Sequence, residues 1–156
     1  MAGRVYTVGI NAVAVSAAQD LFTLLCGSSI PIEIHSVSLG QKTLTAWEAK
    51  ELNFKRVPAT VTVTGGTSVT PRPIMQGDAA SSVTATINNT TLATSSGTIV
   101  DLLNDAWAFL NGFYWSPAGV EDRWIIQPDQ AFCVRLPTAP SESMTVSGTV
   151  TFAELG

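Results

Sequence analysis

The stretch 144-MTVSGTVTF-152 alternates almost strictly between apolar and polar residues. Successive side chains of a β-strand point to opposite sides, so a period of two indicates a strand buried on one face only. The residues that would share the inward face are Met144, Val146, Gly148, Val150 and Phe152. The stretch therefore predicts a half-buried strand near the end of the chain and favours a β-rich fold.

The same period of two recurs earlier in the chain. Residues 4–15 alternate imperfectly, and residues 82–87 form a further short strand pattern. Between Ile34 and Val37 the inward register shifts by one residue, which a β-bulge near His35 would explain. Residues 52–57 and 59–64 are expected to form one strand interrupted at Pro58, since proline donates no hydrogen bond to a ladder.

One segment near the start favours a helix instead. In residues 17–26, Leu21, Leu24 and Leu25 would share one helical face, with Ser16 as the N-cap and Gly27 as the stop. We therefore expect one short helix there, inside an otherwise all-β chain.

The region with the most aromatic residues allows two interpretations. Asn111-Gly112 separates two apolar runs of residues 99–115 and could be the turn of a hairpin, or a bulge in one bent strand. Further on, residues 123–126 and 131–136 flank the turn sequence Gln-Pro-Asp-Gln and predict a hairpin.

The whole pattern fits one domain over residues 1–156, with residues 1–4 as an N-terminal arm. About eight to ten short strands without repeated helices exclude a parallel β-α-β architecture and predict a two-sheet sandwich or a barrel. Polar residues interrupt the N-terminal apolar stretch, which argues against a signal peptide, so Cys26 and Cys133 are expected to be reduced.

Charged residues are scarce, at 13% of the chain and a net charge of −4. No basic block could neutralise a run of phosphates, so nucleic-acid binding is not expected. No apolar stretch reaches the roughly 18 residues needed to span a membrane. Because a monomeric domain carries about 25–35% charged residues on its surface, part of this exterior is expected to be covered by other chains.

The chain lacks the residues that most enzymes use. His35 is the single histidine and lies in an apolar strand pattern, which favours a structural role. No phosphate-binding loop, nucleophile elbow or Cys-x-x-Cys motif is present, so we expect no enzymatic activity, no cofactor and no metal site.

Six aromatic residues within eighteen positions are the most informative side chains: Trp107, Phe109, Phe113, Tyr114, Trp115 and Trp124. The simplest interpretation is that they fill the core, because each ring buries roughly 150–250 Å². In a strand, Tyr114 would point away from its two neighbours, so both faces of that segment would be covered. The alternative is a contact surface, and a homo-oligomer, a trimer above all, would cover it.

Seven segments, spread over most of the chain, resemble small structural proteins of tailed bacteriophages, some of which are jelly-roll decoration (cement) proteins of phage heads. They are RVYTV (4–8), AAQDLF (17–22), LGQ (39–41), TPRP (70–73), NNT (88–90), PDQAFCVRL (128–136) and VSGTVTF (146–152).

The resemblance implies a jelly roll that is assembled in the host cytoplasm and binds the major capsid protein on the head surface as a trimer. Such a protein stabilises the shell without chemistry. Its interface is expected to include Arg4, Arg72, Trp107, Phe113 and Trp115, with the N-terminal arm and the loop around Arg72 reaching outward. The alternatives are a carbohydrate-binding jelly-roll module of a tail fibre or spike, and another minor head or tail protein.

Overall fold

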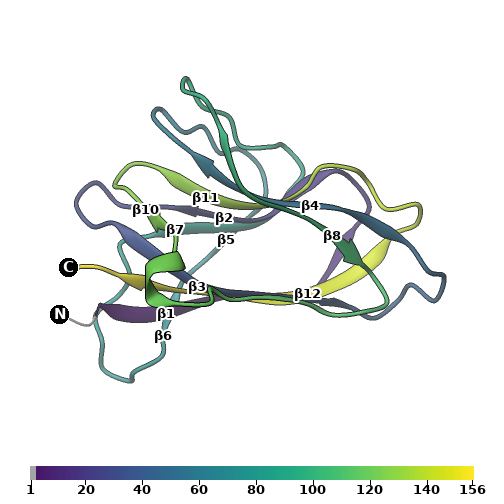
Figure 1. Ribbon diagram of the computed structural model, residues 1–156, viewed down its shortest axis with the longest axis horizontal. Helices are drawn as coiled ribbons and strands as arrows, with labels where there is room; N and C mark the ends of the chain where they lie inside the picture. Colours follow the sequence, from purple (N-terminus) through teal and green to yellow (C-terminus); the bar gives the residue numbers. More distant parts are fainter. Residues whose placement is uncertain (1–2) are drawn as a thin grey trace.

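The computed structural model describes residues 3–156 as two antiparallel β-sheets packed face to face (Figure 1). Strands make up 53% of the chain, and the single helical element of the described residues is the 3-10 turn η1 (Val120–Asp122). The all-β sandwich expected from the alternating patterns is confirmed. None of the described residues forms a helix long and apolar enough to cross a membrane.

The first sheet has the strand order β10-β3-β12-β1-β6, and β9 also pairs with β3. Its strands are β1 (Arg4–Val15), β3 (Ile32–Gln41), β6 (Arg72–Pro73), β9 (Phe113–Trp115), β10 (Ile125–Ile126) and β12 (Met144–Glu154). In β12, four of the five residues predicted to face inward are at most 1% exposed: Met144, Val146, Val150 and Phe152. A Cβ at the fifth, Gly148, would lie 2.5 Å from the carbonyl oxygen of Ser38, so the close approach of β3 requires glycine there.

The second sheet has the strand order β5-β7-β2-β11-β4-β8. Its strands are β2 (Gln19–Leu25), β4 (Ala49–Val57), β5 (Thr67–Val69), β7 (Thr84–Asn89), β8 (Val100–Ala108) and β11 (Ala131–Leu136). The chain changes sheet at every connection except those between β4 and β5, between β7 and β8, and between β9 and β10. Sequence neighbours therefore seldom pair, and nearly all stabilising contacts are long-range.

The predicted helix over residues 17–26 is wrong, because Gln19–Leu25 forms the central strand β2, paired with β11 and β7. Six of its seven residues are buried. Its outer side is covered by a second small core around Val57, Ala93 and Cys133, built with the long segment after β4. A strand covered on both faces loses its period of two, and a continuous apolar run can then imitate a helix.

Both interpretations of residues 99–115 also need correction. β8 pairs with β4 in the second sheet, whereas β9 pairs with β3 in the first, so the segment is neither a hairpin nor one bent strand. The predicted hairpin over residues 123–136 fails for the same reason, since β10 pairs with β3 and β11 lies between β2 and β4. In both cases a turn sequence carries the chain from one sheet to the other.

Two local predictions can be compared directly with the register. The bulge near His35 is confirmed, because Ser36 pairs with Thr151 and Ile34 with Phe152, which leaves His35 as the extra residue. For the N-terminal arm, residues 1–2 lie outside the described residues, and Arg4 already pairs with Glu154 as the first residue of β1.

Candidate interaction surfaces

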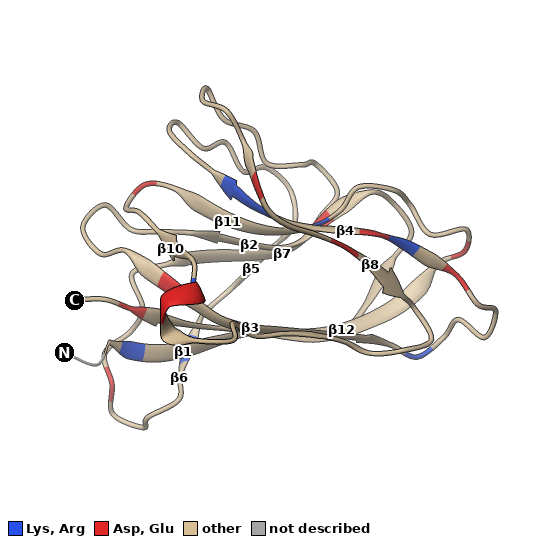
Figure 2. Cartoon of the chain, in the orientation of Figure 1, with Lys and Arg blue, Asp and Glu red and all other residues tan. Residues whose placement is uncertain are grey.

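Charge is almost absent from the middle of the first sheet (Figure 2). Its three long strands carry one Arg, Lys, Asp or Glu each, namely Arg4, Glu33 and Glu154, all near one end of their strands. Apart from Val5, His35 and Ala153 near that same end, most of the outward positions are Ser, Thr, Gly and Asn, such as Thr7, Gly9, Asn11 and Thr149. A surface of this kind is weakly hydrated compared with a charged one and suits close contact with another protein.

Large exposed apolar side chains are concentrated along the two edges of this sheet. Seven such side chains are exposed among the described residues, and six of them belong to two segments. The segments are Ile74–Met75, directly after the edge strand β6, and residues 110–125, which include β9 and β10 at the opposite edge. Trp47, in the β3–β4 loop, is the seventh.

The β9–β10 surface is defined here by Leu110, Tyr114, Val120 and Ile125. Tyr114 is 70% exposed on β9, and Ile125 is 44% exposed on β10. Tyr114 points outward while its two neighbours point inward, as the strand alternation predicts. Within residues 3–156 both strands pair with β3 and with no further strand, so this edge of the sheet presents unpaired backbone groups as well as apolar side chains.

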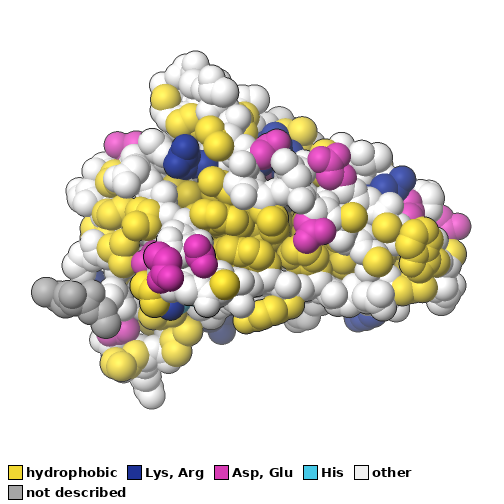
Figure 3. Space-filling model, in the orientation of Figure 1, with side chains coloured by type: hydrophobic (Ala, Val, Ile, Leu, Met, Phe, Trp, Pro, Cys, Tyr) yellow, Lys and Arg dark blue, Asp and Glu magenta, His cyan; other side chains and the backbone are white. Residues whose placement is uncertain are grey.

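A cluster of aromatic rings supports the β9–β10 surface from inside. Phe54 of β4 makes edge-to-face contacts with Phe113, Trp115 and Trp124, each with ring centroids 5.8 Å apart. Trp115 and Trp124 stack on each other at 4.0 Å. Figure 3 shows the apolar band that runs between β8 and the first sheet on this side of the molecule. The partly buried apolar residues packed against the core here fix the backbone that carries Tyr114.

Acidic residues surround the β9–β10 surface. Asp105 on β8 and both Glu121 and Asp122 on η1 are exposed, and none of them forms an ion pair within residues 3–156. Asp101, also on β8, is paired with Lys55. The surface is therefore apolar at its centre and negative around it.

The β6 surface is defined by Ile74, Met75, Arg4 and Arg72. Ile74 and Met75 are 62% and 70% exposed in the loop that hangs below the first sheet after β6 (Figure 1). Together with Gly3, Arg4, Val5 and Asp78 they line an open pocket of about 350 Å³ whose walls are mainly apolar.

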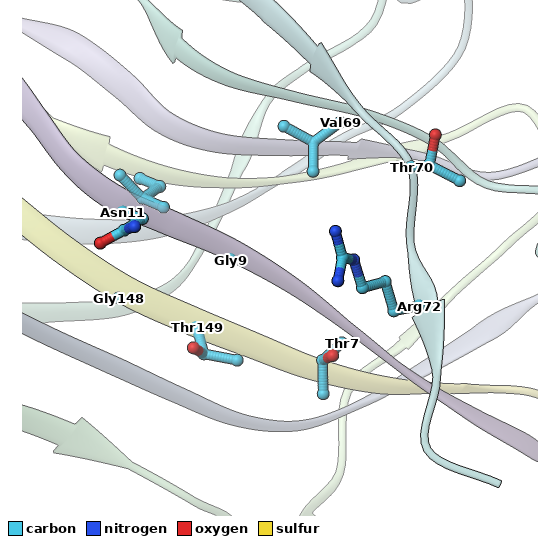
Figure 4. A pocket seen from close by; sticks show the side chains of 9 residues that line it. Thr7, Gly9, Asn11, Val69, Thr70, Arg72, Gly148 and Thr149 are labelled. Carbon is cyan, nitrogen blue, oxygen red and sulfur yellow. The ribbon is translucent and has the colours of Figure 1, made fainter. Parts of the chain in front are cut away.

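Arg72 projects into a neighbouring pocket of about 280 Å³ on the outer face of β1 and β12 (Figure 4). Its guanidinium lies over the strands, with Thr7 and Thr149 below it and Val69 and Thr70 above. A Cβ added to Gly9 would have no neighbour closer than 3.7 Å, so its missing side chain deepens the pocket. Arg72 makes no ion pair with any described residue. A guanidinium in this setting can bind a carboxylate of another molecule by donating hydrogen bonds to it.

The structure brings the expected interface residues to three different places. Arg4 and Arg72 lie on the β6 surface, while Phe113 and Trp115 lie beneath the β9–β10 surface as inward-facing, partly buried rings. Trp107 is 1% exposed, and its indole nitrogen donates to the carbonyl of Asn111 at 3.0 Å. Trp107 is part of the core, as the simplest interpretation of the aromatic cluster predicted, so its side chain is not accessible to a partner.

The exposed apolar residues that define the two surfaces were mostly missed by sequence reasoning. Ile74 and Met75 follow a proline-rich turn, Leu110 ends an apolar run directly before Asn111-Gly112, and Val120 stands alone in a turn, so no periodicity assigns them to a buried or an exposed face. Apolar residues that border turn sequences are the signal that could have found them.

The single histidine belongs to a small polar cluster. His35 Nε2 lies 2.9 Å from Glu33 Oε1, and Arg123 Nη1 donates to the same oxygen at 2.7 Å. Burial raises the pKa of Glu33, but the hydrogen bonds and charges of Arg123 and His35 outweigh it and hold this pKa below its ordinary value. The cluster ties β10 and η1 to β3 and contains no nucleophile.

Glu33→Gln is expected to weaken the acid sensitivity of the fold. A carboxyl group whose pKa is lowered by folding contributes stability above its unfolded pKa and loses it as the pH falls through its folded value. The wild-type protein should therefore lose more stability than the variant between about pH 5 and pH 3. Urea unfolding across this range measures the difference, with Glu121→Gln as the exposed control. Equal losses in wild type and Glu33→Gln would contradict the role of the cluster.

The two cysteines are free and buried. Burial raises the pKa of both Cys26 and Cys133 to about 12, so neither is a thiolate at neutral pH. We expect no reaction of the native protein with a thiol reagent such as dithiobis-nitrobenzoate, and two reactive thiols per chain after denaturation in guanidinium. Rapid modification of the native protein would show that one thiol is accessible.

Within residues 3–156, no group of three or more His, Cys, Asp or Glu side chains is arranged to hold a metal ion. Comparisons with protein-family models, curated proteins and solved structures give no match to this chain. The two apolar surfaces are therefore the features of the molecule that point to a function.

Proposed function

We propose that the protein is a virion structural protein, a decoration protein that binds the head of a tailed bacteriophage as a trimer and stabilises its shell. The observation that carries this proposal is the pairing of two exposed apolar surfaces with a chain that has only 13% charged residues. Large apolar patches on a folded domain are typical of surfaces that other chains cover. The resemblance of its segments to phage structural proteins is the reason for proposing a phage head as the assembly to which it binds.

The fold suits this role if the sandwich is a jelly roll. Four strands in the order β1-β12-β3-β9 face four in the order β2-β11-β4-β8, and each set draws on both halves of the chain. A double-sheet jelly roll has two four-stranded sheets of this kind, which supports the jelly-roll part of the proposal. The segment between β4 and β8 is then an insertion that adds β5, β6 and β7.

Cementing needs no reactive group. A trimer that spans a junction touches several copies of the major capsid protein at once, so modest contacts per chain add up to tight attachment. The neutral, hydroxyl-rich outer face of the first sheet and its two apolar edges provide such contacts.

Sedimentation with phage heads tests the proposal. The protein is mixed with heads assembled without it, the heads are pelleted through a sucrose cushion, and bound copies are counted. We expect saturable binding in multiples of three copies and heads that withstand higher temperatures before they open. Protein that stays in the supernatant at every concentration would contradict the proposal. A change in tryptophan fluorescence on adding sugars, without head binding, would favour the carbohydrate-binding module instead.

A further inference from the structure

We propose that copies of the chain associate head to tail, with the β9–β10 surface of one chain bound to the β6 surface of the next, so that the contact closes into a ring. The inference rests on the proposed function, because the ring would be the trimer that binds the head. It names the partner of both surfaces as a second copy of this chain.

The positions of the two surfaces favour a head-to-tail contact. β10 and β6 lie at the opposite edges of the first sheet, separated by β3, β12 and β1. A contact between two different surfaces of one chain is heterologous, and it forms a closed ring when the rotation between neighbours returns to the start. Such a ring covers six of the seven exposed large apolar side chains of the described residues at once.

Charge argues against a two-fold contact at the β9–β10 surface. In a two-fold dimer that surface would meet its own copy, and Asp105, Glu121 and Asp122 would approach the same acids of the partner. Like charges placed opposite each other at an interface are costly. A contact with a different surface avoids this repulsion.

The β6 surface offers the complementary charge. Arg4 and Arg72 form no ion pair within residues 3–156, and Asp78 is the one carboxylate that lines either of the two pockets there. The Arg72 pocket can take a carboxylate such as that of Asp122, with two parallel hydrogen bonds from the guanidinium.

The shapes of the two surfaces also fit. The pocket beside Met75 has mainly apolar walls and can receive a protruding apolar side chain. Tyr114 and Val120, at 70% and 66% exposed, are the most prominent apolar side chains of the β9–β10 surface. Each surface thus has an apolar centre, and their charges have opposite sign.

Three matched substitutions test the contact: Tyr114→Glu on the β9–β10 surface, Met75→Glu on the β6 surface and Trp47→Glu as the control. All three replace an apolar side chain that is 70–73% exposed, so folding should survive in each. Light scattering after size-exclusion chromatography measures the mass. We expect a trimer for wild type and Trp47→Glu. The other two variants should be monomers, because charge at the centre of an interface weakens association by roughly 30-fold or more.

Mixing the two defective variants identifies the geometry. Tyr114→Glu retains an intact β6 surface and Met75→Glu an intact β9–β10 surface, so a mixture contains a single productive pairing and should form a heterodimer that cannot close. A contact of one surface with itself predicts instead that one of the two variants still associates as wild type does. Either that result or a mixture that stays monomeric overturns the inference.

A charge exchange gives an independent test. Asp122→Arg and Arg72→Glu should each weaken the trimer, and the chain carrying both changes should recover it because the pair is restored with reversed sign. Failure of recovery would overturn the pairing of these two surfaces. A wild-type chain that is monomeric but binds heads would overturn the ring and the trimer, and would leave only the head-binding role of the proposed function standing.

Discussion

Replacing Asp20 with alanine is expected to destabilise the fold by about 3–5 kcal/mol, because it leaves a buried charge without its partner. Asp20 is 0% exposed in β2, and its carboxylate accepts hydrogen bonds from Arg135 Nε at 2.6 Å and from Arg135 Nη2 at 3.1 Å. The same carboxylate accepts the backbone N–H of Ala93 at 2.7 Å, and Arg135 donates to the Ala93 carbonyl at 3.0 Å. One ion pair therefore holds the loop between β7 and β8 against the second sheet.

Urea unfolding followed by tryptophan fluorescence measures this loss, with Asp101→Ala as the control. The side chain of Asp101 is 43% exposed in its pair with Lys55, and exposed pairs contribute about 0–1 kcal/mol. We also expect the amide of Ala93 to exchange faster with solvent in the Asp20→Ala variant. Similar losses for the two alanine variants would show that burial of the Asp20–Arg135 pair does not decide its contribution.

Replacing Phe54 with alanine is expected to cost about 3–5 kcal/mol, the range for removing a buried aromatic ring. Phe54 is fully buried in β4 and makes edge-to-face contacts with four rings, of Phe113, Trp115, Trp124 and Phe132, at centroid distances of 5.7–5.8 Å. The loss combines the transfer free energy of the ring with the cost of the cavity that its removal leaves among the four neighbouring rings.

The same denaturation experiment with Trp47→Ala provides the control for Phe54. Trp47 is also a large ring, but it is 73% exposed, so its removal should change the unfolding free energy by about 0.5 kcal/mol or less. Equal effects of the two substitutions would contradict the placement of Phe54 at the centre of the aromatic cluster.

Sequence reasoning succeeded where a strand has one buried and one exposed face. The alternation in β1 and β12 predicted both strands, and the register shift near His35 predicted the bulge. It failed where both faces are covered. The sequence of β2 predicts a helix because its outer side is also covered, by the segment after β4 and by the Asp20–Arg135 pair. The residues that cover it lie some seventy positions away, so the local sequence pattern does not indicate that this side is buried.

Turn sequences were recognised, but their role was not. Asn111-Gly112 and the Gln-Pro-Asp-Gln sequence of residues 127–130 both separate strands, as expected, yet the strands on either side pair in different sheets. Local turn chemistry reverses or redirects a chain without specifying its next partner, which depends on long-range packing. The interaction surfaces were hidden for a related reason, since exposure of Met75 or Val120 is a property of the assembled sandwich.

The mass of the unmodified protein in solution tests the central claim most directly. Multi-angle light scattering at micromolar concentration should give the mass of three 16.4 kDa chains. This result is expected because two apolar, oppositely charged surfaces of a charge-poor sandwich would be covered by neighbouring copies. A single species of one 16.4 kDa chain over the whole concentration range would contradict the account.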